Sequence, residues 1–529
     1  MYRDHQVSKV YFVSGGFDTP FAKNAQGYST TRILRESRDI KPREGAMSKN
    51  IKSITDPKLK LEILSTEEVQ KIHDATLWII ENVGVRFPSE RALDIWEANG
   101  ATVDREKKIV RAKPNLIEDA LKKCPPAYTL SARDPQQDCP LDGNHVFLGT
   151  DGCGVEVIDI ETGQKRTSAL SDARDIARVA DATEEIGFHW VPVSAQDKPA
   201  ETRGLHEIKT IWENSTKHVQ TESIYSIHEA HAAMEMAALL VGGKQELRKR
   251  PVLSLMQCTA PPLGHDGGSL DAALIAAEHG IPTGFMTMAS CLTTGPATMA
   301  GNLAVGNAEV IAGTALLQLA FPGAPVFYAA AQTAADLQSG AYTGGGPEDF
   351  LFGAATNVLA DFYNIPLSMG AFATGAKEPN WQAGLEGAMS SFMASVVMSD
   401  MLLGCGFLHG SRIWSYAEMM MDCEIFSIVH KMMQGIEVNE ETLALDTIAK
   451  VGPGGHFLAQ KHTRQHAREL FRPEFMDRRP YTEWETKKDE ARDWALAKAR
   501  RIMQEHQPDP LDPKISAEMA KIIESVEKV

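Results

Sequence analysis

Cysteine is scarce in this sequence, and its spacing gives it no role in organising the fold. The 529 residues contain seven cysteines, widely separated and never arranged as a Cys-x-x-Cys pair. A disulfide framework or a cysteine zinc site needs closely spaced sets, so neither is indicated. Free thiols are typical of a reducing compartment, and we expect a cytoplasmic protein.

Positive charge is also in short supply. The chain has 54 Lys and Arg against 70 Asp and Glu, a formal net charge of -16. Nucleic-acid affinity comes largely from Lys and Arg that neutralise phosphates, so we expect no nucleic-acid partner. The most apolar window, Asn302–Phe321, is interrupted by Glu309 and three other polar residues. We therefore expect no membrane-spanning segment either.

Several common catalytic signatures are missing. No nucleophile elbow is present, and no G-x-G-x-x-G follows the first predicted strand. The run Gly344–Glu348 lacks the Lys-Ser/Thr pair of a P-loop, so it is either an anion cradle or a flexible active-site loop, and both readings stay open. His462 and His466 lack the Glu of the H-E-x-x-H pattern, so we interpret them as surface or capping histidines and expect no metal site.

A regular alternation of short apolar runs and helix-length segments begins at His145. Eight runs of strand length are separated by helical patterns, which indicates βα units and a parallel sheet. The candidate strands are His145–Thr150, Phe188–Ala195, His218–Tyr225, Val252–Thr259, Pro282–Ala289, Pro325–Ala331, Pro366–Ala373 and Met401–His409. Eight such units predict an α/β fold, a (β/α)8 TIM barrel whose site lies where the strands end.

The rest of the chain is organised around this barrel. We expect residues 1–46 to be an extension outside the fold and residues 47–140 to form an N-terminal α+β cap. Residues 141–435 then form the TIM-barrel catalytic domain, with an inserted hairpin at Val155–Thr167. Residues 436–529 form a helical C-terminal extension that packs on the barrel. A helix start is marked by Ser65 followed by two acidic residues.

Polar and aromatic side chains gather at the predicted strand ends. Acid–base candidates there are Asp151, Glu222, Asp336, Glu348 and His409. Several aromatic residues near one barrel mouth favour a cage for an alkylated ammonium ion, although core packing is the better interpretation of any single ring. Side chains alternate along a barrel strand, so Phe327 and Tyr328 do not both face the interior.

Four sequence stretches carry a family resemblance. They are GTDGCGVEVIDIETGQKR from Gly149, QSGAYTGGGPE from Gln338, VGPGGHFLAQKHTRQH from Val451 and DRRPYTEWE from Asp477. Together they resemble the trimethylamine methyltransferase (MttB) superfamily, from about residue 60 to the end of the chain. The resemblance implies a TIM barrel that transfers a methyl group from a methylated amine to the Co(I) corrinoid of a small partner protein.

The resemblance also implies a subgroup. The trimethylamine enzymes of methanogens carry pyrrolysine, whereas this sequence uses only the twenty standard residues. Members without pyrrolysine resemble demethylases of quaternary amines such as glycine betaine, proline betaine, carnitine or γ-butyrobetaine. The expected partners are therefore a quaternary amine and a corrinoid protein, with no tightly bound cofactor on this chain itself and a homo-oligomeric state.

The resemblance and the predicted strand ends together give each candidate residue an expected role. We expect a catalytic group of His409, Glu222 and Gln332, with His409 or Arg412 binding the substrate carboxylate. Expected substrate contacts are Tyr328, Phe372, Trp381, Arg412 and Trp414, and expected corrinoid contacts are Asp336, Tyr342, Gly345 and Glu348. Three alternatives remain. They are a pyrrolysine-independent methyltransferase of trimethylamine or dimethylated amines, a non-catalytic module that binds betaine or a corrinoid protein, and a metal-dependent barrel hydrolase.

Overall fold

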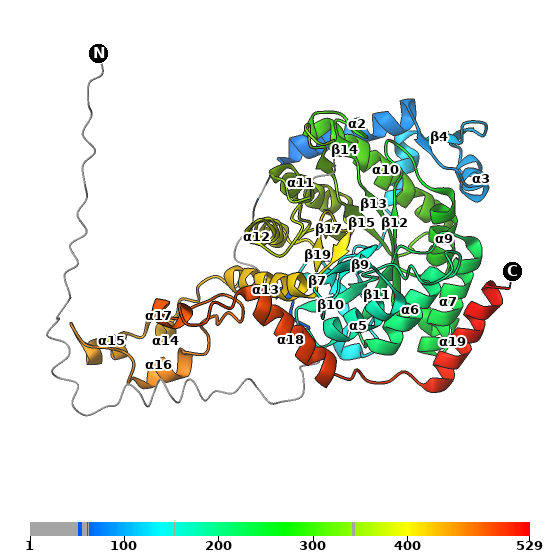
Figure 1. Cartoon of the computed structure of the whole chain (residues 1–529). Helices are drawn as coiled ribbons and strands as arrows, with labels where there is room; N and C mark the ends of the chain where they lie inside the picture. Colours follow the sequence, from blue (N-terminus) through cyan, green and yellow to red (C-terminus); the bar gives the residue numbers. More distant parts are fainter. Residues whose placement is uncertain (1–50, 56–60, 62, 153, 341–343, 529) are drawn as a thin grey trace, which may run out of the picture. The chain divides into compact units, whose positions relative to one another are not determined.

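Eight parallel strands form a closed barrel at the centre of the protein (Figure 1). The computed structural model describes residues 51–55, 61, 63–152, 154–340 and 344–528. Each strand pairs with the next, and the last pairs with the first. The strands are β7 (His145–Thr150), β10 (Ile186–Trp190), β11 (His218–Thr221), β12 (Leu253–Cys258), β13 (Thr283–Thr287), β15 (Val326–Ala330), β17 (Leu367–Gly370) and β18 (Met401–Cys405). The predicted TIM barrel is confirmed, with β10 starting at Ile186 rather than Phe188.

Helices surround the barrel and connect its strands (Figure 1). They are α5 (Leu170–Asp181), α6 (Arg203–Asn214), α7 (Ile227–Val241) with the short α8 (Lys244–Lys249), α9 (Gly267–Glu278), α10 (Met299–Ala320), α11 (Pro347–Tyr363), α12 (Trp381–Val396) and α13 (Tyr416–Met433). Four begin at a short polar residue, Ser226, Asp266, Asn380 or Ser415, whose side chain accepts a backbone N–H. These N-caps explain where the helices start.

Helix α10 contradicts the composition argument against a membrane span, but not the expectation that none is present. By length and composition it is long and apolar enough to cross a membrane, but 83% of its most apolar window is buried inside the protein. Its carboxylate Glu309 is buried and accepts hydrogen bonds from the Thr259 hydroxyl (2.6 Å), the Thr287 hydroxyl (2.9 Å) and the Leu263 N–H (2.7 Å). A core helix that supports the ends of β12 and β13 accounts for both the apolar composition and the buried acid.

The barrel interior is packed with large side chains. Phe147, Phe188, Met256, Phe327 and Met401 belong to one buried cluster, each from a different strand. Their neighbours in sequence on the opposite strand face, such as Leu148 and Tyr328, belong to the cluster between the sheet and the helices. Period-two alternation thus assigns each strand residue to the lumen or to the outer layer.

The N-terminal elements close the amino end of the barrel. They are β1 (Ile54–Thr55), α2 (Thr66–Asn82), β2 (Val85–Arg86), α3 (Glu90–Ala98), β3 (Thr102–Asp104), β4 (Ile109–Arg111), α4 (Pro114–Leu121), β5 (Tyr128–Leu130), the 3-10 turn η2 (Pro135–Gln137) and β6 (Cys139–Leu141). The Tyr128 hydroxyl donates to the carbonyl of Val326 at the start of β15, and Leu130 and Leu141 join the lumen cluster. Ser65 and Glu68 form the capping box that starts α2.

Short additional strands lie at the carboxyl end of the barrel. The predicted hairpin is present as β8 (Glu156–Ile158) and β9 (Lys165–Thr167), and it forms a four-stranded sheet with β19 (Phe407–Leu408) and β20 (Ile413–Trp414). A second pair consists of β14 (Ser290–Cys291) and β16 (Thr333–Ala334). These additions hold the loops that follow β7, β13, β15 and β18.

The C-terminal helices differ in their packing. They are α14 (Glu440–Leu443), α15 (Leu445–Val451), α16 (Lys461–His466), α17 (Tyr481–Trp484), α18 (Ala491–Glu505) and α19 (Pro513–Val526). Helix α18 packs against α13 and α5, and α19 packs against α7 and α6. Helices α14 to α17 bury no side chain. Packing on the barrel therefore holds for α18 and α19, and we call residues 436–484 the arm.

Candidate active site

A cavity of about 580 Å³ opens where the barrel strands end. Every one of the eight strands contributes a lining residue between its middle and the first position beyond its carboxyl end. In strand order these are Asp151, Trp190, Glu222, Cys258, Met286, Ala331, Ala371 and Leu403. This is the end at which TIM-barrel enzymes carry their active sites. The cavity is therefore the candidate active site.

Two buried carboxyl groups form the acidic floor of the cavity, Asp151 and Glu222. Burial raises the pKa of Glu222 to about 8, and the nearby Asp151 carboxylate adds to this rise. Burial raises the pKa of Asp151 to about 6, partly offset by hydrogen bonds from the Ser411 side chain and the Gly152 N–H. At neutral pH the floor therefore carries about one negative charge, on Asp151, while Glu222 is mostly protonated.

Trp190 is the only aromatic residue among the described residues that line the cavity. Its position depends on Gly152, because a Cβ on that residue would lie 2.4 Å from the indole ring. The thioethers Met286 and Met288 and the Cys258 thiol line the same space. The Cys258 sulfur lies 3.8 Å from a Glu222 carboxyl oxygen. One indole face, soft sulfur groups and two carboxyls thus surround the space.

Three basic side chains form the rim, Lys377, His409 and Arg412, and all three are exposed. The pKa of His409 is lowered, first by desolvation and then by the positive charges of Lys377 and Arg412. The histidine is therefore mostly neutral near pH 7, while the lysine and arginine carry charge. The cavity combines a buried acidic floor with an exposed basic rim.

The rim turn is conformationally strained. His409, Gly410 and Ser411 all have left-handed backbones, with φ values of 55°, 62° and 59°. Each non-glycine residue in this region costs on the order of 1–3 kcal/mol. Hydrogen bonds hold the turn, from the His409 N–H to the Ala376 carbonyl (2.8 Å) and from the Gly410 N–H to the Thr374 carbonyl (2.9 Å). Such strain is typical of functional turns that the surrounding structure fixes in place.

Comparison with known proteins now adds the family. The chain matches the trimethylamine methyltransferase (MTTB) family over residues 31–528. The chain belongs to this family. It is 34% identical to the glycine betaine methyltransferase of Desulfitobacterium hafniense strain Y51 over 467 residues, covering 88% of this chain and 97% of that protein. It is 32% identical to the trimethylamine methyltransferase MttB of strain DSM 10664 / DCB-2 of the same species, covering 88% and 93%.

A solved structure is also similar. The monomethylamine methyltransferase MtmB of Methanosarcina barkeri aligns with a TM-score of 0.48 and 11% identity, covering 83% of this chain and 92% of that chain. The family match and the two curated relatives make this member of the MTTB family an amine methyltransferase. The predicted family is thereby confirmed.

Two residues expected to contact substrate lie on the wrong side of the sheet. Tyr328 and Phe372 are buried in the layer between the strands and the outer helices. On β15 and just beyond it, the residues that face the lumen are Phe327 and Ala331. Just beyond β17, they are Ala371 and Ala373. The alternation rule was correct, but the wrong member of each pair was chosen. We therefore remove both rings from the substrate-contacting set.

Three more expected contacts lie elsewhere in the MTTB-family barrel. Trp381 starts α12 with 79% of its side chain exposed and lines a separate apolar groove. Trp414 is buried against Phe407 and Tyr416. Gln332 is buried and donates to the carbonyl of Asn302 (2.8 Å) in α10. None of the three lines the cavity.

The expected corrinoid contacts lie in the loop after β15 and at the start of α11. Asp336 is partly buried and accepts hydrogen bonds from the Gln338 and Ser339 backbone. Gly345 has φ 85° beside the Glu386 side chain, and Glu348 is in the first turn of α11. Tyr342 falls outside the described residues. These positions remain a prediction about the partner's approach.

Of the expected residues, the structure brings Glu222, His409 and Arg412 together in the cavity. Asp151, expected as an acid–base candidate, lines the same cavity, and so does Trp190 at the end of β10. Cys258, Met286, Lys377 and Ser411 were missed. The signal for Cys258 and Met286 was alternation along β12 and β13, because residues 256 and 258 share one face, as do 286 and 288.

Proposed function

We propose that this enzyme transfers one methyl group from a carboxylated quaternary amine to the Co(I) corrinoid of a small partner protein. The candidate donors are glycine betaine, proline betaine, carnitine and γ-butyrobetaine. The observation that carries the proposal is the pairing of the acidic floor with the basic rim. A substrate with a cationic head and a carboxylate tail complements both. The two relatives differ by only two percentage points of identity, so the choice of substrate rests on the cavity.

The floor would receive the trimethylammonium head. The face of Trp190 offers a cation–π interaction worth roughly 0.5–2 kcal/mol. Positive charge leaves the nitrogen as its bond to the methyl group breaks, so an ionised carboxylate beside it stabilises the bound substrate more than the transition state. Glu222 is mostly protonated at pH 7 because of its raised pKa. The free floor thus starts from about one negative charge rather than two, and any ionisation of Glu222 when the ammonium binds adds to the stabilisation of the bound substrate.

The rim would receive the carboxylate tail. Arg412 presents a planar guanidinium that pairs with a carboxylate through two parallel hydrogen bonds, and Lys377 adds a point charge. His409 is mostly neutral and so serves as a hydrogen-bond donor there. We keep His409 and Arg412 in the carboxylate-binding role and replace the expected aromatic cage with Trp190.

The methyl acceptor would come from the partner. Cys258 is the one thiol among the described lining residues, and burial holds its pKa well above the usual range, so it does not act as a thiolate. The corrinoid supplies a strongly nucleophilic Co(I) centre. Its electron pair would form the new bond to the methyl carbon as the N–CH₃ bond breaks, the N–C electron pair would stay on nitrogen to give a neutral tertiary amine, and no proton would be required. This chain aligns one methyl group with the cavity opening.

The partner would dock at the carboxyl end of the barrel. The positions proposed to contact it are Asp336, Tyr342, Gly345 and Glu348. We propose no tightly bound cofactor on this chain.

The direct test is an anaerobic assay with Co(I) cobalamin and candidate corrinoid proteins across a substrate panel. The panel contains the four carboxylated amines, with choline and trimethylamine as matched compounds that lack the carboxylate. We expect methyl transfer, followed by absorbance, from at least one carboxylated amine and little from choline. Turnover of trimethylamine and of no other compound in the panel would refute the proposal. Binding of a betaine without any transfer would favour the non-catalytic module.

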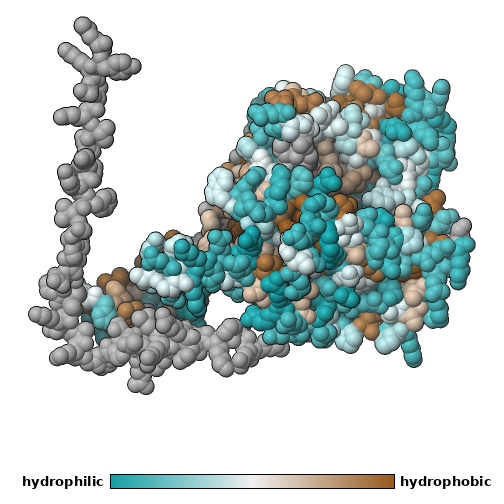
Figure 2. Space-filling view, in the orientation of Figure 1, coloured by the Kyte–Doolittle hydropathy of each residue, from teal (hydrophilic) through white to brown (hydrophobic). Residues whose placement is uncertain are grey.

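We further propose a homo-oligomer in the cytoplasm. The arm exposes apolar side chains, including Val438, Leu445 and Leu470, and Figure 2 shows apolar patches on this segment. An apolar groove of about 630 Å³ between α12 and α13 is lined by Trp381 and Met389. Exposed apolar surface of this kind marks protein contacts, and a second copy offers complementary surfaces. Light scattering coupled to size exclusion tests this, and a monomer would refute it.

A further inference from the structure

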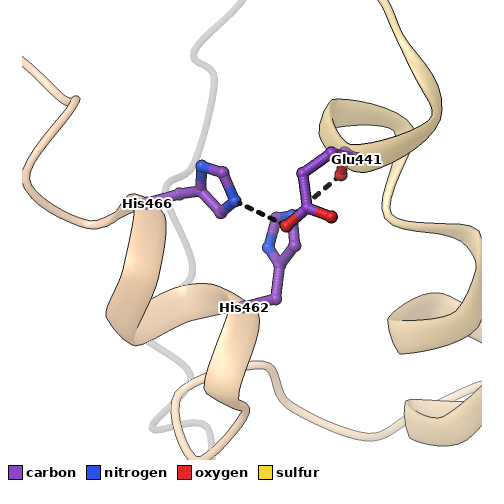
Figure 3. Close-up of side chains that lie close together, drawn as sticks. All are labelled: Glu441, His462 and His466. Carbon is purple, nitrogen blue, oxygen red and sulfur yellow. Dashed lines mark hydrogen bonds and ion pairs between the residues drawn. The ribbon is translucent and has the colours of Figure 1, made fainter.

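The arm contains a cluster of metal-ligating side chains that the methyl-transfer site does not use. Glu441 comes from α14, and His462 and His466 come from α16 (Figure 3). Their ligand atoms all lie within 4.8 Å of one another. The two histidines are four residues apart, so a helix places both rings on one face, and their ring centroids are 4.2 Å apart. Nε2 of His462 lies 3.2 Å from the backbone carbonyl of Glu441, so two chain segments place the three side chains around one small volume (Figure 3).

A further carboxylate orients one of these rings. Glu469 lies 2.8 Å from Nδ1 of His466, and Nε2 of the same ring faces Glu441 at 3.2 Å. Both carboxylates only accept hydrogen bonds, so both ring nitrogens donate here; a metal ion that replaced the proton on Nε2 would leave Nδ1–H on Glu469 and bind the freed lone pair. Histidine ligands of zinc are commonly fixed in this way by a carboxylate on the second nitrogen. Glu469 therefore has the position of an orienting residue.

The part of the arm around the cluster, residues 436–470, also lacks the usual means of holding its shape, because the one buried side chain of the arm, Phe475, lies beyond it. Helix α14 has four residues and α16 has six, and neither buries a side chain. Isolated helices this short are unstable in water, because nucleation is costly and few hydrogen bonds follow it. Segments without a hydrophobic core are commonly held by a metal ion or a disulfide. The described cysteines are all free thiols, so no described disulfide does this.

We propose that Glu441, His462 and His466 bind one divalent transition-metal ion, most simply Zn²⁺, which joins α14 to α16. Imidazole and carboxylate ligands suit zinc, and a fourth tetrahedral position is left for water. The ion would fix the shape of the arm and would have no part in the methyl-transfer cavity. This replaces the interpretation of these histidines as surface or capping residues.

The test measures zinc on the untagged full-length chain. After treatment with a chelator and gel filtration, the chain is titrated with ZnCl₂ against a chromophoric zinc indicator. Metal content by mass spectrometry and limited proteolysis of the arm are measured in parallel. We expect one zinc per chain and slower cleavage within residues 436–484 when zinc is present. CoCl₂ in place of zinc should give the visible absorption of a tetrahedral site.

Variants separate ligation from general histidine binding. His462→Ala and His466→Ala should each weaken zinc binding by roughly 100-fold and abolish the protection from proteolysis. Glu441→Gln keeps the size of the side chain and should weaken binding less. His456→Ala removes a neighbouring histidine outside the cluster and should leave binding unchanged. No retained zinc in the parent chain, or equal zinc binding by the His462 and His466 variants, would overturn the proposal.

Discussion

Glu222 should lose a proton when a quaternary amine binds. Its pKa in the free enzyme is about 8, so at pH 7 it is roughly 90% protonated. An ammonium about 5 Å away interacts with the carboxylate by about 3 kcal/mol at an effective dielectric of 20. That energy lowers the pKa by roughly 2, which leaves the group mostly ionised at pH 7. Binding should therefore release roughly 0.8 proton from Glu222, and about 0.1 more from Asp151.

Isothermal titration calorimetry in buffers of different ionisation enthalpy measures this release directly, without a corrinoid partner. Glu222→Gln should reduce it to about 0.1 proton, the part expected from Asp151 with its pKa of about 6. Trimethyl-substituted ligands should show the release, and an uncharged isostere should not. Proton release that persists in the Glu222→Gln variant would refute the assignment of the head group to the floor.

The same raised pKa has a consequence for the free enzyme. The folded state keeps a proton on Glu222 from about pH 4.5 to about pH 8, while the unfolded chain has already lost it. The free energy of unfolding should therefore fall by up to about 1.4 kcal/mol per pH unit across this window. Glu222→Gln should flatten that slope in urea titrations. An unchanged slope would show that Glu222 titrates normally in the folded protein.

Three further predictions test the rim and the corrected residues. Arg412→Ala should raise KM for carboxylated amines by roughly 10-fold or more and leave choline binding by calorimetry unchanged, because only the former have a carboxylate to lose. His409→Gly should stabilise the fold by about 1 kcal/mol in thermal melts, because glycine accepts φ 55°, while it lowers kcat/KM. Tyr328→Phe removes a buried hydroxyl that has no hydrogen-bond partner among the described residues, so it should not destabilise the protein and should leave KM unchanged. A large loss of activity in Tyr328→Phe would show that the hydroxyl takes part in the reaction, against its position outside the cavity.

The fold was predictable because its signals are local and repeated. Each barrel strand is a short apolar run followed by a helical pattern, and the order of eight such units leaves few architectures. Helix starts such as Ser65 and Ser226 are set by capping groups within a few residues. Composition alone could not decide whether α10 spans a membrane, because burial inside a protein and burial inside a lipid bilayer select the same apolar residues.

The site was only half predictable, because it depends on which strand face points inward. Alternation gives two registers for each strand, and nothing local in β15 distinguishes Phe327 from Tyr328. One polar residue known to face the lumen just beyond a strand end would have decided which face of that strand points inward. Glu222, His409 and Arg412 were found because charged residues near strand ends have few other reasons to be there. Lys377 was missed because it lies in a loop, several residues beyond β17.

The division between floor and rim also bears on how one barrel serves several methylated amines. The floor residues Asp151, Trp190 and Glu222 follow directly from the ends of β7, β10 and β11, so their geometry is tied to the sheet. The rim residues lie on loops, and the strained turn at His409 is held by only a few backbone hydrogen bonds. Loops change more freely than strands without loss of the fold. Recognition of the ammonium head should then be common to enzymes built on such a floor, while the rim decides which tail, or none, is accepted.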